Sequence, residues 1–229
     1  MEQYYSNSIC PVCKVELGFH DEDQAEDCWS KMKSEDQKIS TISSLKTLGE
    51  LSHSFGTQRF DALNEVVVLY NTDAWFNAEK WLGSDSKGLY LHGEPGTGKT
   101  HAARCILNQA LDDGLPVMEI SAHKMIRCGQ RFDSESTMKR IASVDILLID
   151  DIDKAIWNDK SIAILWELLN ERDDRGCRTI ITTNVPSEKF RVIFADGNSG
   201  NGSVIESMIQ RLHPIKTIAF NGISVRGIV

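Results

Sequence analysis

The segment 88–100, GLYLHGEPGTGKT, constrains the fold of this 229-residue chain more than any other stretch. An apolar run is followed by three glycines within six residues, and then by a lysine and a threonine. This spacing fits G-x-x-x-x-G-K-[ST], in which a glycine-rich loop joins a strand to a helix. The backbone N–H groups of such a loop and the positive end of the helix dipole bind anions. The segment therefore predicts a nucleoside triphosphate site; the alternative is a chance glycine turn.

The predicted phosphate-binding residues are Gly93, Glu94, Pro95, Gly96, Thr97, Gly98, Lys99 and Thr100. In this pattern the lysine reaches the β and γ phosphates of ATP, and the hydroxyl group after it binds Mg²⁺. We therefore expect ATP and Mg²⁺ as cofactors, with Lys99 on the phosphates and Thr100 on the metal.

Short apolar segments alternate with helical patterns from about residue 58 onward. The expected strands are 88–93, 116–121, 145–150, 178–184 and 216–220, and the clearest helices are 99–113 and 159–174. Such alternation predicts an α/β fold in which a parallel sheet carries helices on both faces. Ligands of such sheets bind beyond the carboxyl ends of the strands.

The segment DILLIDDID places acidic residues directly after a buried strand. Asp150, at the end of the strand, is expected to hold Mg²⁺, and Asp151 to orient or deprotonate the attacking water. The alternative is that these acids only cap the next helix. Because aspartate is one methylene shorter than glutamate, we expect Asp151 to support slow ATP hydrolysis.

Two further polar residues are catalytic candidates. Asn184 follows the strand after the acidic one, where an amide can help to position water, although asparagine is also a common turn former. Arg211 lies near the end of an amphipathic helix expected over 204–214. It is either a cation that offsets the negative helix end or an arginine finger for the nucleotide site of a neighbouring subunit.

The charge distribution argues against general nucleic-acid binding. The net charge is −8, and residues 1–57 hold 10 acidic and 5 basic residues. Affinity for the nucleic-acid backbone comes from cations, so any such contact needs a local basic stripe, and the acidic N-terminal part is expected to face a protein. No apolar run of about 18 residues or signal-peptide pattern is found, which predicts a cytoplasmic protein without a membrane partner.

Four potential metal ligands lie close together near the N-terminus. CPVC at 10–13 is followed by His20 and Cys28, and Zn²⁺ binds four such ligands tetrahedrally. A segment this short cannot form a core by itself, so a metal would replace one. A redox pair and unliganded cysteines remain alternatives, and His53 or a water could replace His20. We expect a small zinc module and linker over 1–57, before an ATPase domain over 58–229.

Several motifs together resemble the DnaC/DnaI/IstB-type AAA+ ATPases, which include the replicative-helicase loaders. These motifs are GEPGTGKTHAA, LLIDDID, IITTN, SMIQRLHP and FNGISVRG, in this order within residues 56–229. The resemblance implies a P-loop NTPase fold of the ASCE/AAA+ class with strand order 5-1-4-3-2. It also implies a catalytic acid at Asp151, a sensor at Asn184 and an arginine finger at Arg211.

The resemblance adds His101 and Arg226 as nucleotide-binding candidates, and Phe60 as an apolar residue near the adenine. The zinc module at the N-terminus resembles the helicase-binding domain of some loaders. Two features depart from the family. Asp153 takes a place often held by glycine, and the sequence ends at Val229, so that no helical lid domain of the kind found in larger AAA+ proteins is expected.

The resemblance implies a helicase loader of bacterial or phage DNA replication that self-associates, binds single-stranded DNA and delivers a hexameric helicase. The candidate DNA contacts are Lys124, Arg127 and Arg131, because cations interleave there with the aromatic Phe132. A solvated helix face is the alternative at this segment. The alternatives for the whole chain are an IstB-like transposition helper and a nucleotide-gated adaptor that scarcely hydrolyses ATP.

Overall fold

The computed structural model describes residues 60, 72–131, 134–194, 202–222 and 224. The predictions for 1–57, including the zinc module, lie outside these residues. So does Arg226. Of the helices in the described part of the chain, none has the length and apolar composition needed to cross a membrane.

Five parallel strands form a single sheet with the order β2-β3-β4-β1-β5. They are β1 (Gly88–Gly93), β2 (Val117–Ser121), β3 (Ile146–Asp150), β4 (Arg178–Thr183) and β5 (Ile215–Phe220). Read from the other edge, this order is 5-1-4-3-2, so the predicted fold class and strand order are confirmed. The residues Ile146 to Ile149 are fully buried, as expected for a strand with helices on both faces.

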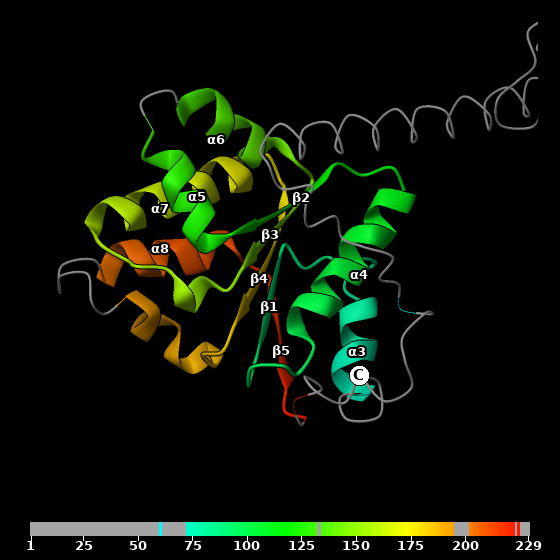
Figure 1. Ribbon diagram of the computed structural model, residues 1–229. Coiled ribbons are helices and arrows are strands. Elements are labelled where there is room, and N and C mark those ends of the chain that lie inside the picture. Colours follow the sequence, from blue (N-terminus) through cyan, green and yellow to red (C-terminus); the bar gives the residue numbers. More distant parts are fainter. Residues whose placement is uncertain (1–59, 61–71, 132–133, 195–201, 223, 225–229) are drawn as a thin grey trace, which may run out of the picture.

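Helices cover both faces of the sheet (Figure 1). On one side lie α3 (Thr72–Glu79) and α4 (Lys99–Asp112). On the other side lie α5 (Ala122–Gly129), α6 (Ser134–Ser143), α7 (Asp159–Asp174) and α8 (Gly202–Arg211). Two short 3₁₀ helices, η3 (Ile152–Lys154) and η4 (Ser187–Phe194), follow β3 and β4.

Local sequence signals explain where the longest helices begin and end. Asn158 and Ser161 form a capping box at the start of α7, in which each side chain bonds the backbone of the other residue. After α4 and α7 the chain turns at Gly114 and Gly176, both with positive φ. The helix expected over 204–214 is wrong at its C-terminal end, because α8 ends at Arg211. The residue before a proline disfavours helical geometry, and His213 precedes Pro214.

The register of the strands brings separate segments of the chain to one edge of the sheet. Thr183 pairs with His92, and Asp150 pairs with Ser121. Gly93 pairs with Phe220, and a Cβ atom at Gly93 would lie 2.1 Å from the carbonyl oxygen of Phe220. Only glycine fits at this position, which joins β1 to the predicted phosphate loop.

Candidate nucleotide-binding site

The phosphate loop connects the end of β1 to the start of α4, as the sequence predicts. Gly93, Gly96 and Gly98 all have positive φ, at 146°, 86° and 99°. These backbone conformations are accessible to glycine and strained for other residues. Gly98 is the N-cap of α4 and has no side chain that could accept a hydrogen bond from the first turn of the helix. The N-cap therefore does not compete with a ligand for the backbone N–H groups of this turn. This geometry suits a bound phosphate group.

Lys99 is held against the loop by three acceptors. Its side chain is largely buried, with only 6% of the residue exposed. Its Nζ atom donates to the carbonyl oxygens of Gly93 and Glu94, both at 2.8 Å, and to Oδ1 of Asn184 at 3.2 Å. These three acceptors use all three N–H bonds of the ammonium group, so a phosphate group that enters must take the place of one of them, and its charged oxygen is the stronger partner.

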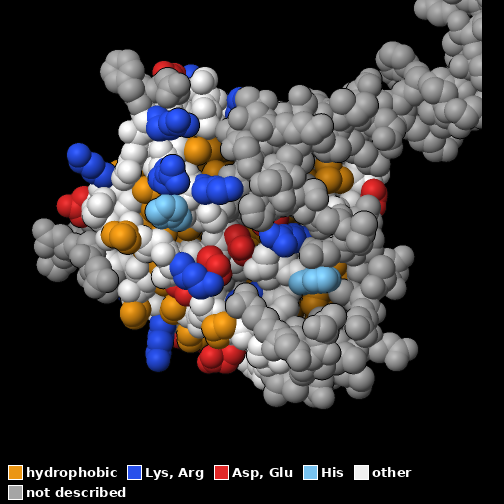
Figure 2. Space-filling model, in the orientation of Figure 1, with side chains coloured by type: hydrophobic (Ala, Val, Ile, Leu, Met, Phe, Trp, Pro, Cys, Tyr) orange, Lys and Arg blue, Asp and Glu red, His pale blue; other side chains and the backbone are white. Residues whose placement is uncertain are grey.

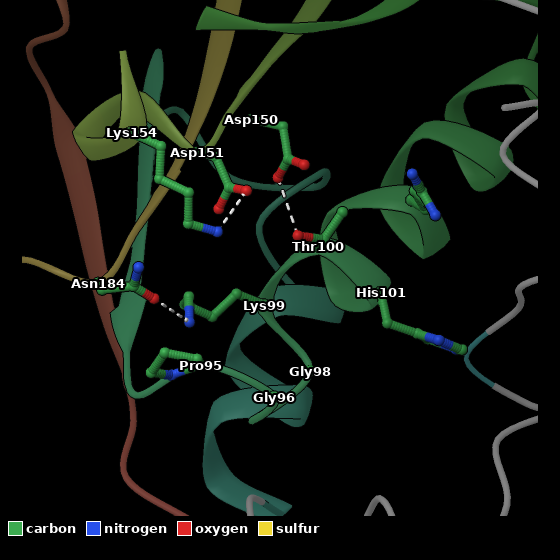
Figure 3. A pocket seen from close by; sticks show the side chains of 11 residues that line it. Pro95, Gly96, Gly98, Lys99, Thr100, His101, Asp150, Asp151, Lys154 and Asn184 are labelled. Atoms are coloured by element: carbon green, nitrogen blue, oxygen red, sulfur yellow. Dashed lines mark hydrogen bonds and ion pairs between the residues drawn. The ribbon is translucent and has the colours of Figure 1, made fainter. Parts of the chain in front are cut away.

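Thr100 and Asp150 meet across the cleft, as the sequence predicts. Thr100 Oγ1 donates to Asp150 Oδ1 at 2.8 Å (Figure 3). Thr182 Oγ1, from the neighbouring strand, donates to the same oxygen at 2.5 Å and accepts from the backbone N–H of Asp151 at 2.9 Å. A carboxylate with a hydroxyl group beside it fits the oxygen ligands that Mg²⁺ prefers. Thr100 and Asp150 are thus the side chains that would hold this ion.

Asp151 lies beside the metal candidate but points to a different partner. Its backbone is left-handed, with φ of 54°, which is uncommon for a residue other than glycine. Its Oδ2 atom is 2.6 Å from Nζ of Lys154, and both side chains face the cleft (Figure 3). The position fits a group that acts on the attacking water, and backbone conformations of this uncommon kind are found most often at functional sites.

Asn184 lies between the phosphate loop and η3. While its Oδ1 accepts from Lys99, its backbone N–H and its Nδ2 donate to the two carboxylate oxygens of Asp153, at 3.0 and 2.9 Å. Asp153, which departs from the family pattern in the sequence, is therefore bonded directly to the sensor candidate.

A cavity of about 380 Å³ is lined by Lys99, Thr100, Asp150, Asp151 and Asn184, among others. Its walls come from the phosphate loop, the first turns of α4 and the carboxyl ends of β3 and β4. Arg104, one turn after Thr100, also lines the cavity and is held by Glu119 through two hydrogen bonds of 2.9 and 2.7 Å. These hydrogen bonds raise the pKa of the Arg104 guanidinium. The cavity therefore offers cations to a phosphate chain and acids to its metal.

His101 lines the same cavity, but its side chain points away from the phosphate loop and packs against an aromatic cluster (Figure 3). Its ring stands edge-on to Trp75 of α3, with centroids 5.7 Å apart, and Phe60 and Phe220 contact the same tryptophan. Burial lowers the pKa of His101, and the neighbouring Arg104 lowers it further. A neutral imidazole on this apolar cluster fits a wall near a nucleobase better than a phosphate ligand.

Arg211 is not among the residues that line this cavity. It ends α8, where Nε donates to Asn170 Oδ1 at 2.7 Å and the guanidinium group also bonds Ser207 and lies 5.5 Å from the centroid of the Trp166 ring. The structure thus brings Asp151 and Asn184 to the site of their own chain but holds Arg211 on the surface of α7 and α8.

The DNA-contact candidates lie on α5 and just after it. Arg127 and Arg131 are exposed and Lys124 is half-buried, whereas Phe132 lies outside the described residues. Lys and Arg side chains gather over α5 and α6 in the space-filling view (Figure 2). Basic side chains therefore cluster on this face.

The sequence interpretation missed Thr182, Lys154 and the role of Asp153. Thr182 is a fully buried residue of β4, and a hydroxyl residue in a strand expected to be buried is a usable signal, because buried hydroxyl groups need partners. The sequence carries no local signal of the contact between Asp153 and Asn184, since the two residues are 31 positions apart in the chain. As for metal sites, no group of three or more His, Cys, Asp or Glu side chains within the described ranges could hold an ion. The predicted zinc ligands Cys10, Cys13, His20 and Cys28 lie outside these ranges.

Residues 89–194 match the family model of the "ATPase family associated with various cellular activities (AAA)". This match covers just under half of the chain, which in this region is therefore similar to AAA domains. An insertion sequence ATP-binding protein of Sinorhizobium fredii is 26% identical to the chain over 122 residues, which are 52% of this chain and 40% of that protein. The chain spans less than half the length of the curated relatives that it matches.

Solved structures share this fold. The DnaC helicase loader matches with a TM-score of 0.56 and 18% identity, over 72% of this chain and 97% of that one. A structure of DnaA bound to AMPPCP and single-stranded DNA matches with a TM-score of 0.53 and 19% identity, over 72% of this chain and 50% of that one. The predicted resemblance to DnaC/DnaI/IstB-type AAA+ ATPases is confirmed.

Proposed function

We propose that the chain is an ATP-dependent helicase loader of bacterial or phage DNA replication. The observation that carries the proposal is the convergence of Lys99, the Thr100–Asp150 pair and Asn184 on one cleft at the carboxyl edge of the sheet. The coverage of nearly the whole DnaC helicase loader chain at the level of the fold supports the loader assignment.

In this proposal each side chain of the cleft has one task. Lys99 and the loop amides bind the β and γ phosphates, and Thr100 and Asp150 hold Mg²⁺, which when bound neutralises charge on the phosphates. Asp151 orients the attacking water and accepts its proton, and Asn184 helps to position this water. Arg226 is an additional nucleotide contact in the proposal, carried over from the family tail motif.

Arg211 acts in the nucleotide site of a neighbouring subunit. Its position at the end of α8, outside the cavity of its own chain, is compatible with a finger that works in trans. To reach a partner it must leave Asn170 and Ser207, so we expect self-association to compete with these contacts.

Single-stranded DNA binds along α5, through Lys124, Arg127 and Arg131. The basic side chains over α5 and α6 and the DNA-bound state of the DnaA structure support this assignment. Reversing the three charges is expected to weaken single-strand binding by at least about tenfold at moderate salt, since each lost phosphate contact reduces affinity. Unchanged binding, measured by fluorescence anisotropy, would leave α5 as a solvated face.

Residues 1–57 form a zinc module that binds the hexameric helicase. Cys10, Cys13, His20 and Cys28 are its ligands in this proposal, and their spacing supports it. Metal analysis of protein purified under reducing conditions is expected to give one zinc ion per chain. A protein free of zinc would rule the module out.

Two measurements test the whole proposal. Hydrolysis of ATP is expected to be slow alone and faster with single-stranded DNA. Co-purification with a hexameric replicative helicase is expected for the full chain and lost without residues 1–57. A protein that binds ATP but never hydrolyses it, with or without DNA, would instead be a nucleotide-gated adaptor.

The similarity to the insertion sequence ATP-binding protein supports a second candidate, a transposition helper that marks target DNA. A transposase as bait distinguishes the two. Capture by transposase and not by helicase would favour the helper, and the reverse would favour the loader.

A further inference from the structure

We propose that Asp153 is a positioning residue that fixes which end of the Asn184 amide faces the phosphate site. Asp153 makes Asn184 present its carbonyl oxygen to Lys99, and it keeps the amino group away from the terminal phosphate. The inference rests on the proposed ATP site and concerns how that site distinguishes ATP from ADP.

The carboxylate of Asp153 grips Asn184 with both oxygens. Oδ1 accepts from the backbone N–H of Asn184 at 3.0 Å, and Oδ2 accepts from Nδ2 at 2.9 Å. Asp153 lies in η3, directly after the acidic strand, and Asn184 follows the adjacent strand β4. One bond fixes the backbone and the other the side chain, so the amide has little freedom to rotate.

The opposite end of the amide faces a cation. Asn184 Oδ1 accepts from Lys99 Nζ at 3.2 Å. A reversed amide would turn its oxygen toward a carboxylate, which has no proton to donate, and its NH₂ group toward an ammonium group, which has no lone pair. The charges of Asp153 and Lys99 therefore fix which end of the Asn184 amide is the oxygen and which is the nitrogen.

This orientation changes what Asn184 does in the site. An amide NH₂ group that faced the cavity would donate to the γ-phosphate and so favour ATP over ADP. Here the amide nitrogen donates one of its two N–H bonds to Asp153 and points away from Lys99 and the phosphate loop (Figure 3). Asn184 instead contributes by holding Lys99, whose phosphate contacts extend to the β-phosphate, which both nucleotides have. Asn184 therefore supports the two nucleotides alike.

Asp153→Asn is expected to reverse the amide. The new side chain has a single oxygen, which accepts from the backbone N–H of Asn184, and its NH₂ group then faces the Asn184 side chain. Once a bound phosphate has taken the Lys99 ammonium group from Asn184, the Asn184 oxygen is free to accept from this NH₂ group, which turns the NH₂ group of Asn184 toward the phosphate. Asp153→Gly removes both hydrogen bonds to Asn184, so that the amide NH₂ group can turn and donate to a phosphate.

The experiment is a double-mutant cycle with the full chain, in which calorimetry measures the affinities for AMPPCP and ADP with Mg²⁺. The variants are Asp153→Asn, Asn184→Ala, their combination, and Asp153→Gly. Asp85→Asn, an exposed acid in the turn before β1, controls for the change of charge. Thermal unfolding of each variant checks the fold, and Asp153→Gly carries the test if Asp153→Asn fails to fold.

For Asn184→Ala alone, we expect both affinities to fall by about threefold and their ratio to change by less than about twofold. Asp153→Asn should raise the preference for AMPPCP over ADP by about fivefold or more, and adding Asn184→Ala should remove that gain. Asp153→Gly should raise the preference by a smaller factor.

The inference is overturned if Asn184→Ala alone removes an existing preference for AMPPCP, because the amino group would then already serve the phosphate. It is equally overturned if neither Asp153 variant changes the preference. A wild-type protein that binds neither nucleotide would overturn the proposed function instead, so the two failures are distinct.

Discussion

At the amino end of the sheet, Arg172 and Arg178 are bonded almost entirely to backbone carbonyl groups. At the carboxyl end, by contrast, Lys99, Asp150 and Asn184 are bonded to loop carbonyl groups and to other side chains around a cavity. Arg172 is 1% exposed and donates to carbonyl oxygens of Ile141, Ala142 and Val144. No ligand could replace these partners without opening the core.

Arg178 completes the arrangement at the amino end. Its guanidinium group donates to the carbonyl oxygens of Trp81, Leu82 and Ser86 and stacks on the Trp81 ring at 3.8 Å. These bonds tie the turn before β1 to the start of β4. The same strand β4 thus carries a structural arginine at one end and the site residues Thr182 and Asn184 at or just beyond the other.

The comparison shows what separates a structural charge from a functional one in this fold. Both ends satisfy their polar groups, but the amino end uses fixed backbone carbonyl groups. The carboxyl end uses side chains and loop carbonyl groups beside a cavity of about 380 Å³, where phosphate and metal can exchange with them.

The largest expected effect comes from Arg172→Ala. The substitution leaves several buried carbonyl groups without donors and opens a cavity, so we expect a loss of about 3–5 kcal/mol in the free energy of unfolding. Urea denaturation measures it. The matched control is Arg175→Ala, because the exposed pair of Arg175 with Glu171 is expected to contribute less than about 0.5 kcal/mol. Equal losses in both variants would remove the distinction between the two ends.

Lys99→Ala tests the carboxyl end. We expect the affinity for ATP to fall by about 100-fold, because two or more charge-assisted bonds to phosphate are lost. The free energy of unfolding should change by no more than about 1 kcal/mol. Lys87→Ala, which breaks an ion pair with Asp173 instead, is the control and should leave ATP affinity unchanged. Full affinity in Lys99→Ala would contradict the nucleotide site itself.

Asp151→Glu sharpens the comparison within the cleft. The longer side chain brings the carboxylate closer to the attacking water, so we expect the turnover number for ATP to rise by about threefold or more. Turnover measured at saturating ATP provides the test, with Asp151→Asn as the inactive counterpart. No increase would mean that the length of Asp151 does not limit hydrolysis.

The smallest expected effect is a pH dependence of stability. Burial lowers the pKa values of His92 and His101, so the folded protein favours the neutral imidazoles. Below about pH 6.5 the unfolded chain binds these protons first, and stability should therefore fall as the pH drops from 7 to 5, by less than about 1 kcal/mol for each histidine. His101→Gln should flatten the decrease, whereas the exposed His123→Gln should not. An unchanged slope in His101→Gln would show that the burial of this ring has no effect on stability.

The parts of the fold that were predictable have local signals. The glycines of the phosphate loop, the apolar run before Asp150 and the helix at 159–174 can each be recognised within about 16 residues. Strand boundaries were correct to within one residue, because burial on both faces requires continuous apolar runs. The end of α8 differs from the expected helix end because Pro214 disfavours helical geometry at His213.

The amino-acid sequence by itself determined that the chain has a phosphate loop, where it lies between strand and helix, and which acids follow the next buried strand. Only the tertiary structure decided that Thr182 supports Asp150, that Asp153 orients Asn184 and that Arg211 lies away from the cavity of its own chain. The reason is physical. Backbone conformation depends on neighbouring residues, whereas the partner of a side chain depends on the register of strands that are distant in sequence.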